Sequence, residues 1–128
     1  ESLGAGVAAG AVRACNVPIA GVLLVTPWDE LATPASAAFP VLPVRTLLRD
    51  RFDSVAALAR YQGPLGVVIA ERDAVIPPAS GQALYARFAG TKRRWVVPGA
   101  GHNDWMNSVN EAWWREVTGF LAAGPAGR

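Results

Sequence analysis

Apolar and polar residues follow one another along this chain in blocks that predict alternating helices and strands. Ala20–Val25 and Gly66–Ala70 are continuous apolar runs, and Arg93–Val97 is a third strand-like segment. Continuous apolar runs are typical of parallel strands that are covered on both faces. Helix-like segments precede, separate and follow the three runs. This order predicts an α/β fold with a parallel sheet and helices on both of its faces.

The predicted helices differ in how clearly their ends are marked. Residues 2–14 are rich in Ala, Gly and Val, and their glycines would weaken an isolated helix by about 1 kcal/mol each, so we expect a tightly packed, buried helix. Asp53 or Ser54 can cap a short helix. Ser108 and Glu111 have capping-box spacing for the last helix. One apolar face of that helix would comprise Val109, Ala112, Trp113, Val117, Phe120 and Leu121.

Residues 27–50 interrupt this pattern. They hold several prolines and show little periodicity, so we expect a lid- or cap-like excursion from the sheet. The aromatic and aliphatic side chains of Trp28, Phe39 and Leu42 favour an apolar pocket. We therefore expect these three residues to line a substrate pocket.

Composition limits the class of protein. The chain has 128 residues, of which 52% are hydrophobic and 17% charged, so residues 1–128 are expected to fold as part of one domain rather than stay disordered. The net charge of +2 is small and scattered, which gives nucleic-acid binding little support. No apolar run reaches the ~20 residues of a membrane span, so we expect no membrane segment in this chain and a cytoplasmic location.

Cysteine and histidine counts argue against metal chemistry. Cys15 is the only cysteine, which excludes an intrachain disulfide and any pair of metal-binding cysteines. With one histidine and no clustered acids, the chain offers too few ligands for a catalytic metal. We expect neither a metal nor another cofactor.

Three residues that together can perform nucleophilic catalysis stand at predicted strand ends. Ser2 precedes the first helix, Asp73 follows the second strand, and His102 follows the third. A serine hydroxyl needs a base to take its proton, and His102 is the only side chain with an ordinary pKa near neutrality. Asp73 could orient the imidazole. Because ligands bind at the carboxyl edge of parallel sheets, we expect the three side chains to meet there.

Neighbouring residues fit the same chemistry. The backbone N–H of Leu3 could donate to an oxyanion at the start of the helix. Gly4 would leave room beside a strained serine turn, and Gly99 and Gly101 would let the histidine loop turn sharply.

Simpler interpretations remain open for each residue. Ser2 could be only a helix N-cap. Asp104 competes with Asp73 as the acid, although capping the last helix suits it better. Cys15 could be a nucleophile, but its place at the far end of the first helix favours a buried apolar role.

Three segments resemble a known family. Glu1-Ser-Leu-Gly-Ala-Gly6 resembles the latter part of a nucleophile elbow, and residues 71–78 and 98–105 resemble the acid and histidine loops of α/β-hydrolases. The similarity is to the serine-aminopeptidase-like group, with the bud-emergence-type hydrolases and protein depalmitoylases. It covers nearly the whole chain but only the C-terminal half of the family's domain. Because the chain starts at Glu1, we expect the N-terminal strands and the second oxyanion loop to be missing from it.

The resemblance implies a catalytic triad of Ser2, Asp73 and His102. A serine hydrolase of this kind would cleave an ester, thioester or amide of a small-molecule or acyl substrate through an acyl-serine intermediate. The alternative is a non-catalytic α/β-hydrolase-like binding or interaction module. We expect the full-length protein to be the active enzyme and this chain alone to be inactive or nearly so. Neither the type of bond cleaved nor the oligomeric state follows from the sequence.

Overall fold

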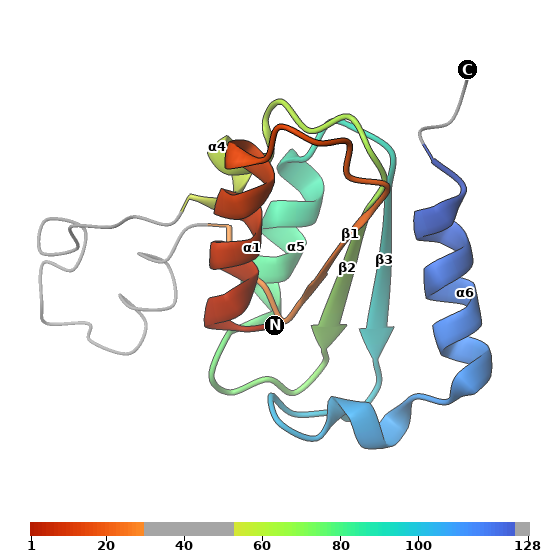
Figure 1. Cartoon of the computed structure of the whole chain (residues 1–128). Helices are drawn as coiled ribbons and strands as arrows, with labels where there is room; N and C mark the ends of the chain where they lie inside the picture. The colour runs from red at the N-terminus through yellow and green to blue at the C-terminus, as the bar shows by residue number, and fades with distance from the viewer. Residues whose placement is uncertain (30–52, 125–128) are drawn as a thin grey trace, which may run out of the picture.

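The computed structural model describes residues 1–29 and 53–124, which contain one parallel sheet (Figure 1). Its strands are β1 (Val22–Val25), β2 (Leu65–Ala70) and β3 (Lys92–Val97), paired in the order β1-β2-β3. Both pairs of strands are parallel. The predicted α/β class and parallel sheet are confirmed.

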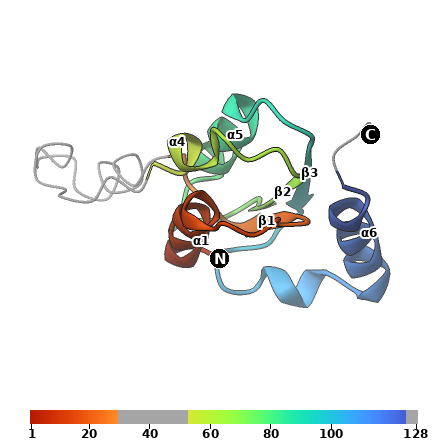
Figure 2. The ribbon, with the colours of Figure 1, turned by 45° about the horizontal axis from the view of Figure 1, so that its top comes forward.

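Helices lie on both faces of this sheet, as the two views in Figures 1 and 2 show. On one face lie α1 (Leu3–Ala14), α4 (Ser54–Leu58) and α5 (Pro78–Arg87), and on the other lies α6 (Glu111–Ala122). A short 3₁₀ helix, η1 (Trp105–Ser108), leads into α6.

Alternation along the strands divides the core into two layers. Leu24, Val67 and Ile69 point toward α1, α4 and α5, where they pack with side chains such as Leu58 and Leu84. The intervening residues face α6. That second layer comprises Val25, Val68, Ala70, Trp95, Val97, Ala100, Trp105 and Val117. Because β2 lies between the other strands and is covered on both faces, all six of its residues are buried.

The sequence predicted the N-cap of α4 correctly and that of α6 wrongly. Asp53 caps α4 as expected, accepting a hydrogen bond from the Ala56 N–H at 2.8 Å. The capping box predicted for the last helix is wrong. Asn110 caps α6 by accepting from the Trp113 N–H at 3.0 Å, because η1 takes up Ser108 and the chain turns only after it.

Helix α1 departs from its expected burial. Only Ala5, Gly6 and Ala9 are buried, whereas Val7 is 55% exposed, so the prediction of a buried helix is wrong for the part of the chain described. The small residues form one narrow face, which packs on α4 and β1. None of the described helices is long and apolar enough to cross a membrane.

Candidate active site

Ser2 lies at the start of α1, beside the carboxyl end of β1. Its N–H donates to the carbonyl of Val25, the last residue of β1, at 3.0 Å. Its backbone has φ 50° and ψ −127°, a left-handed conformation that is uncommon and strained for a residue with a Cβ.

The Ser2 side chain does not cap the helix that it precedes. Ser2 occupies the N-cap position of α1, but its hydroxyl makes no capping hydrogen bond. Its Oγ lies instead 3.0 Å from Nε2 of His102. The interpretation of Ser2 as only a helix cap is therefore wrong.

Asp73 is held by the loop that follows β2. Its Oδ1 accepts hydrogen bonds from the N–H groups of Val75 at 2.9 Å and Ile76 at 2.8 Å. Its Oδ2 lies 2.7 Å from Nδ1 of His102, and the side chain is only 1% exposed. The carboxylate is thus fixed from both sides, with one oxygen committed to the loop and the other to the imidazole.

His102 bridges the two residues from the loop after β3. Because an ionised carboxylate can only accept, Nδ1 carries the proton that it donates to Asp73. Nε2 of the neutral ring is then an acceptor for the Ser2 hydroxyl. The His102 side chain is 11% exposed, so a small part of it is open to solvent. The three predicted residues converge at the carboxyl edge of the sheet.

Backbone bonds hold the acid and histidine loops together. The N–H of Glu71 donates to the Val97 carbonyl at 3.1 Å, and that of Arg72 to the Ala100 carbonyl at 2.8 Å. The Glu71 carboxylate in turn accepts from the N–H of Gly99 at 2.7 Å. These contacts set the distance between the two loops before any side chain of the triad is considered.

The glycines of these loops have different roles. Gly99 has φ +68°, as expected for a sharp turn that favours glycine. Gly101 has no left-handed backbone, and its N–H instead donates to Asp104 at 2.6 Å. At Gly4 a side chain would have open space, because no atom of the described chain lies within 4 Å of the place a Cβ would take. The expected need for a glycine beside the serine turn is therefore not seen among the described residues.

The two competing residues do not join the site. Asp104 accepts a hydrogen bond from the Gly101 N–H and makes none with His102. It occupies the N-cap position of η1 without a capping side-chain bond, and Asn110 caps α6 instead. Cys15 is exposed rather than buried, because the chain leaves the helix at this C-cap residue in an extended conformation. The buried role predicted for Cys15 is wrong, and its thiol lies at the other end of α1 from Ser2.

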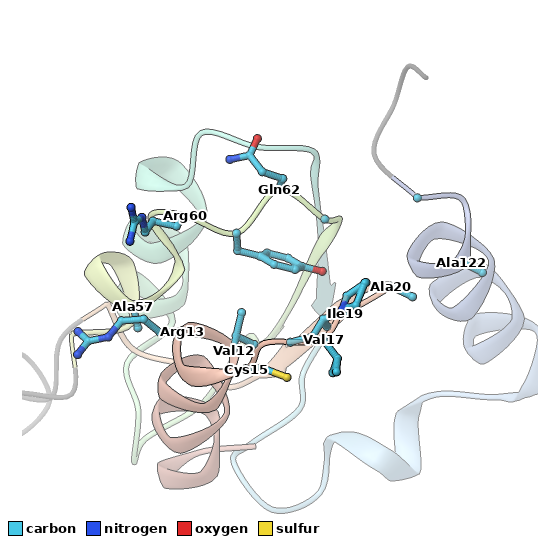
Figure 3. Close-up of a pocket in the computed structure, with 14 residues that line it drawn as sticks. Val12, Arg13, Cys15, Val17, Ile19, Ala20, Ala57, Arg60, Gln62 and Ala122 are labelled. Carbon is cyan, nitrogen blue, oxygen red and sulfur yellow. The ribbon is translucent and has the colours of Figure 1, made fainter.

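A cavity in the described chain lies at the opposite edge of the sheet from Ser2. It has a volume of about 800 Å³, and Figure 3 shows Val12, Cys15 and Ile19 at its wall. Its lining comes from segments that precede β1 and β2 and from the ends of α1 and α6. Tyr61 also lines it, and burial raises the pKa of this phenol. Because Ser2, Asp73 and His102 do not line it, the cavity is separate from the triad.

The expected substrate pocket is only partly within the described residues. Trp28 is 2% exposed and belongs to the core after β1. Phe39 and Leu42, with most of the excursion predicted over 27–50, lie outside the described residues. Leu3 is the first residue of α1, so its N–H is among those that lack an intrahelical acceptor.

Two contacts of the site had no signal in the sequence pattern. Trp105 donates from Nε1 to Oε1 of Glu1 at 3.0 Å, joining residues 104 positions apart. The bond between Glu71 and Gly99 is the second.

Within residues 1–29 and 53–124, no group of three His, Cys, Asp or Glu side chains could hold a metal ion.

Comparison by sequence finds relatives that are longer than this chain. No model of a known protein family matches the sequence. Two uncharacterised proteins of Mycobacterium tuberculosis, from strains CDC 1551 / Oshkosh and H37Rv, are each 39% identical over 104 residues. The match covers 81% of this chain and 36% of each relative. The chain thus spans about a third of the length of the curated relatives that it matches.

Comparison by structure identifies the fold. An acetyl xylan esterase from Paenibacillus sp. R4 superposes with a TM-score of 0.67 at 20% identity, over 95% of this chain and 43% of the esterase. The Pyrococcus furiosus esterase Pf2001 gives 0.65 at 22% identity, over 95% and 50% of the two chains. These neighbours have the α/β-hydrolase fold, and the described chain has part of that fold.

Proposed function

We propose that the full-length protein containing this chain is a serine hydrolase whose nucleophile is Ser2. The observation that carries the proposal is the pair of hydrogen bonds made by His102, at 3.0 Å to Ser2 Oγ and 2.7 Å to Asp73 Oδ2. A buried acid, an oriented imidazole and a serine on a strained turn are the parts that acyl transfer requires.

Acylation follows from this arrangement. Ser2 Oγ attacks the carbonyl carbon of an ester, thioester or amide while Nε2 of His102 takes the hydroxyl proton. Asp73 stabilises the imidazolium that forms, because its carboxylate stays hydrogen-bonded to Nδ1. The Leu3 N–H, at the positive end of α1, donates to the oxyanion.

The same groups complete acylation and then carry out deacylation. The tetrahedral intermediate collapses, His102 passes its proton to the leaving group, and the acyl group remains on Ser2. The neutral imidazole then takes a proton from water, which attacks the acyl carbon. Collapse of the second intermediate returns the proton to Ser2 Oγ and releases a carboxylic acid.

The hydrogen-bonded chain also weighs against a purely non-catalytic module. A left-handed conformation costs energy at a residue with a Cβ, and such strain is concentrated at functional sites, which favours a working site at Ser2 over a purely binding surface. The esterase neighbours make an ester the first substrate class to test, with thioesters and amides next.

The proposal is tested by labelling the full-length protein with a fluorophosphonate probe, which reacts with activated serines. We expect covalent labelling of the wild type and none of the Ser2→Ala variant, with hydrolysis of p-nitrophenyl acetate lost in parallel. A loss of about 10⁶-fold in turnover is the scale set by removing a triad serine.

A matched control is Ser108→Ala, since Ser108 is an exposed serine away from the triad. This variant should label at the wild-type rate. A folded wild-type protein that resists the probe and hydrolyses no ester, thioester or amide would favour the binding module instead.

A further inference from the structure

We propose that Glu1 and Trp105 form a positioning pair that fixes the nucleophile turn against the histidine loop. The inference rests on the proposed hydrolase function and adds two residues to it. Glu1 directly precedes Ser2, and Trp105 lies three residues after His102. Their side chains are joined by the hydrogen bond from Trp105 Nε1 to Glu1 Oε1, at 3.0 Å.

Trp105 is a firm anchor for this bond. The residue is 3% exposed, and its ring lies 6.2 Å from that of Trp113 and 6.1 Å from that of Trp114, measured between centroids. Both partners belong to α6, which packs on the sheet through the buried side chain of Val117. The indole can therefore move only if this aromatic cluster moves.

The indole also needs its partner. A tryptophan N–H can only donate, and a largely buried donor without an acceptor loses about 1–3 kcal/mol of stability. Among the described residues, Glu1 Oε1 is the acceptor that the indole reaches. An ionised acceptor makes such a bond shorter and stronger than a neutral one.

The pair matters because few hydrogen bonds connect the segment of Ser2 to the histidine loop among the described residues. The acid and histidine loops are joined by several backbone bonds, including Arg72 to Ala100. Ser2 itself is attached by its N–H to β1, on the other side of β2 from the histidine strand. Besides the Ser2–His102 bond, the Glu1–Trp105 bond links the two segments directly within the described chain.

The proposed consequence is control of the distance between Ser2 Oγ and His102 Nε2. Because Glu1 is covalently next to Ser2, loss of its tether lets the strained turn relax away from the imidazole. Misplacement of reacting groups by about 1 Å can cost 10²-fold in rate, so a reduction of about 10- to 100-fold in acylation is expected. The binding of substrate by other parts of the protein should change little.

The experiment measures the rate constant of fluorophosphonate labelling in the full-length protein. Glu1→Ala and Trp105→Phe should each slow labelling, and the double variant should be no slower than the slower single variant. Glu1→Gln keeps a carbonyl oxygen that can accept from the indole, so it should restore most of the rate. Glu111→Ala, which removes an exposed carboxylate on α6, should leave the rate unchanged.

A spectroscopic readout separates this inference from the proposed function. The indole N–H resonance of Trp105, assigned by its loss in Trp105→Phe, should shift and exchange faster with water in Glu1→Ala but not in Glu1→Gln. A Glu1→Ala variant that labels at the wild-type rate would overturn the positioning pair but not the proposed function. Additive effects of Glu1→Ala and Trp105→Phe on the labelling rate would do the same. If the wild type itself does not label, the proposed function fails, whatever the indole resonance shows.

Discussion

The Asp73 carboxylate selects the tautomer of His102. Because it accepts the Nδ1 proton, Nε2 keeps a free lone pair toward the Ser2 hydroxyl. One of the carboxylate oxygens is held by two backbone N–H groups, and the other takes the Nδ1 proton. The side chain is almost fully buried, so no water can replace it as the partner of the imidazole without opening the loop. A single buried acceptor thus sets the tautomer of the proposed base.

We expect Asp73→Asn to lower kcat by about 10³- to 10⁴-fold while KM changes little. An amide has the shape of the carboxylate, but its NH₂ group can donate to Nδ1 and so favours the tautomer in which Nε2 bears the proton. The measurement is steady-state hydrolysis of p-nitrophenyl acetate by the full-length protein. The control is Asp104→Asn, which removes a carboxylate of the same loop region that makes no bond to His102. Near-wild-type turnover of Asp73→Asn would contradict the role assigned to Asp73.

Individual residues were predictable where their chemistry is rare in the chain. His102 is the only histidine, so a base near neutral pH could be located from composition alone. Glu1 and Trp105 carry no such signal, because glutamate and tryptophan have many uses and the two are 104 positions apart. Only the folded chain brings their side chains to hydrogen-bonding distance.

The entry into α6 depends on a cap that the pattern misplaced. Ser108 and Glu111 have the spacing of a capping box, but η1 extends to Ser108 and the helix begins after Asn110. The 3₁₀ turn has no apolar period of its own, so the sequence gives no warning of it. Trp105, the first residue of η1, packs against Trp113 and Trp114 of α6, and this is a tertiary contact that no local pattern encodes.

We expect Asn110→Ala to lower the free energy of unfolding by about 1 kcal/mol, since the Trp113 N–H loses its acceptor. Ser108→Ala should change it by less than about 0.5 kcal/mol, as is usual for exposed positions. Urea denaturation of the full-length variants, followed by circular dichroism, measures both. A larger effect of Ser108→Ala than of Asn110→Ala would restore the capping box.

Among the described strands, β1 and β3 form the two edges of the sheet. β1 pairs with β2 alone among the described strands, although its residues are largely buried. The chain covers 36% of its curated relatives and 43–50% of the esterases that share its fold. The arrangement of Ser2, Asp73 and His102 therefore sits on part of a larger fold, and the proposed activity is to be tested on the full-length protein.

We expect the isolated 128-residue chain to be poorly stable and to hydrolyse p-nitrophenyl acetate at least about 10²-fold more slowly than the full-length protein. Loss of one oxyanion donor alone has an effect of this size, and an unpaired edge strand promotes aggregation. The measurement compares Ser2-dependent turnover, taken as the difference from Ser2→Ala, in the two proteins. Robust Ser2-dependent turnover by the isolated chain would show that it already contains a sufficient site.

The sequence by itself determined the α/β class, the parallel strands and the order in which serine, acid and histidine follow strand ends. Those features depend on short-range patterns, namely apolar runs, breaks and residue types, which act over a few positions. The tertiary structure added which atoms of Ser2, Asp73 and His102 hydrogen-bond and at what distances. It alone decided that Cys15 is exposed and that Glu1 meets Trp105. These outcomes depend on which strands pair and on how α6 and η1 pack against them, and such distant contacts leave no local periodicity in the chain.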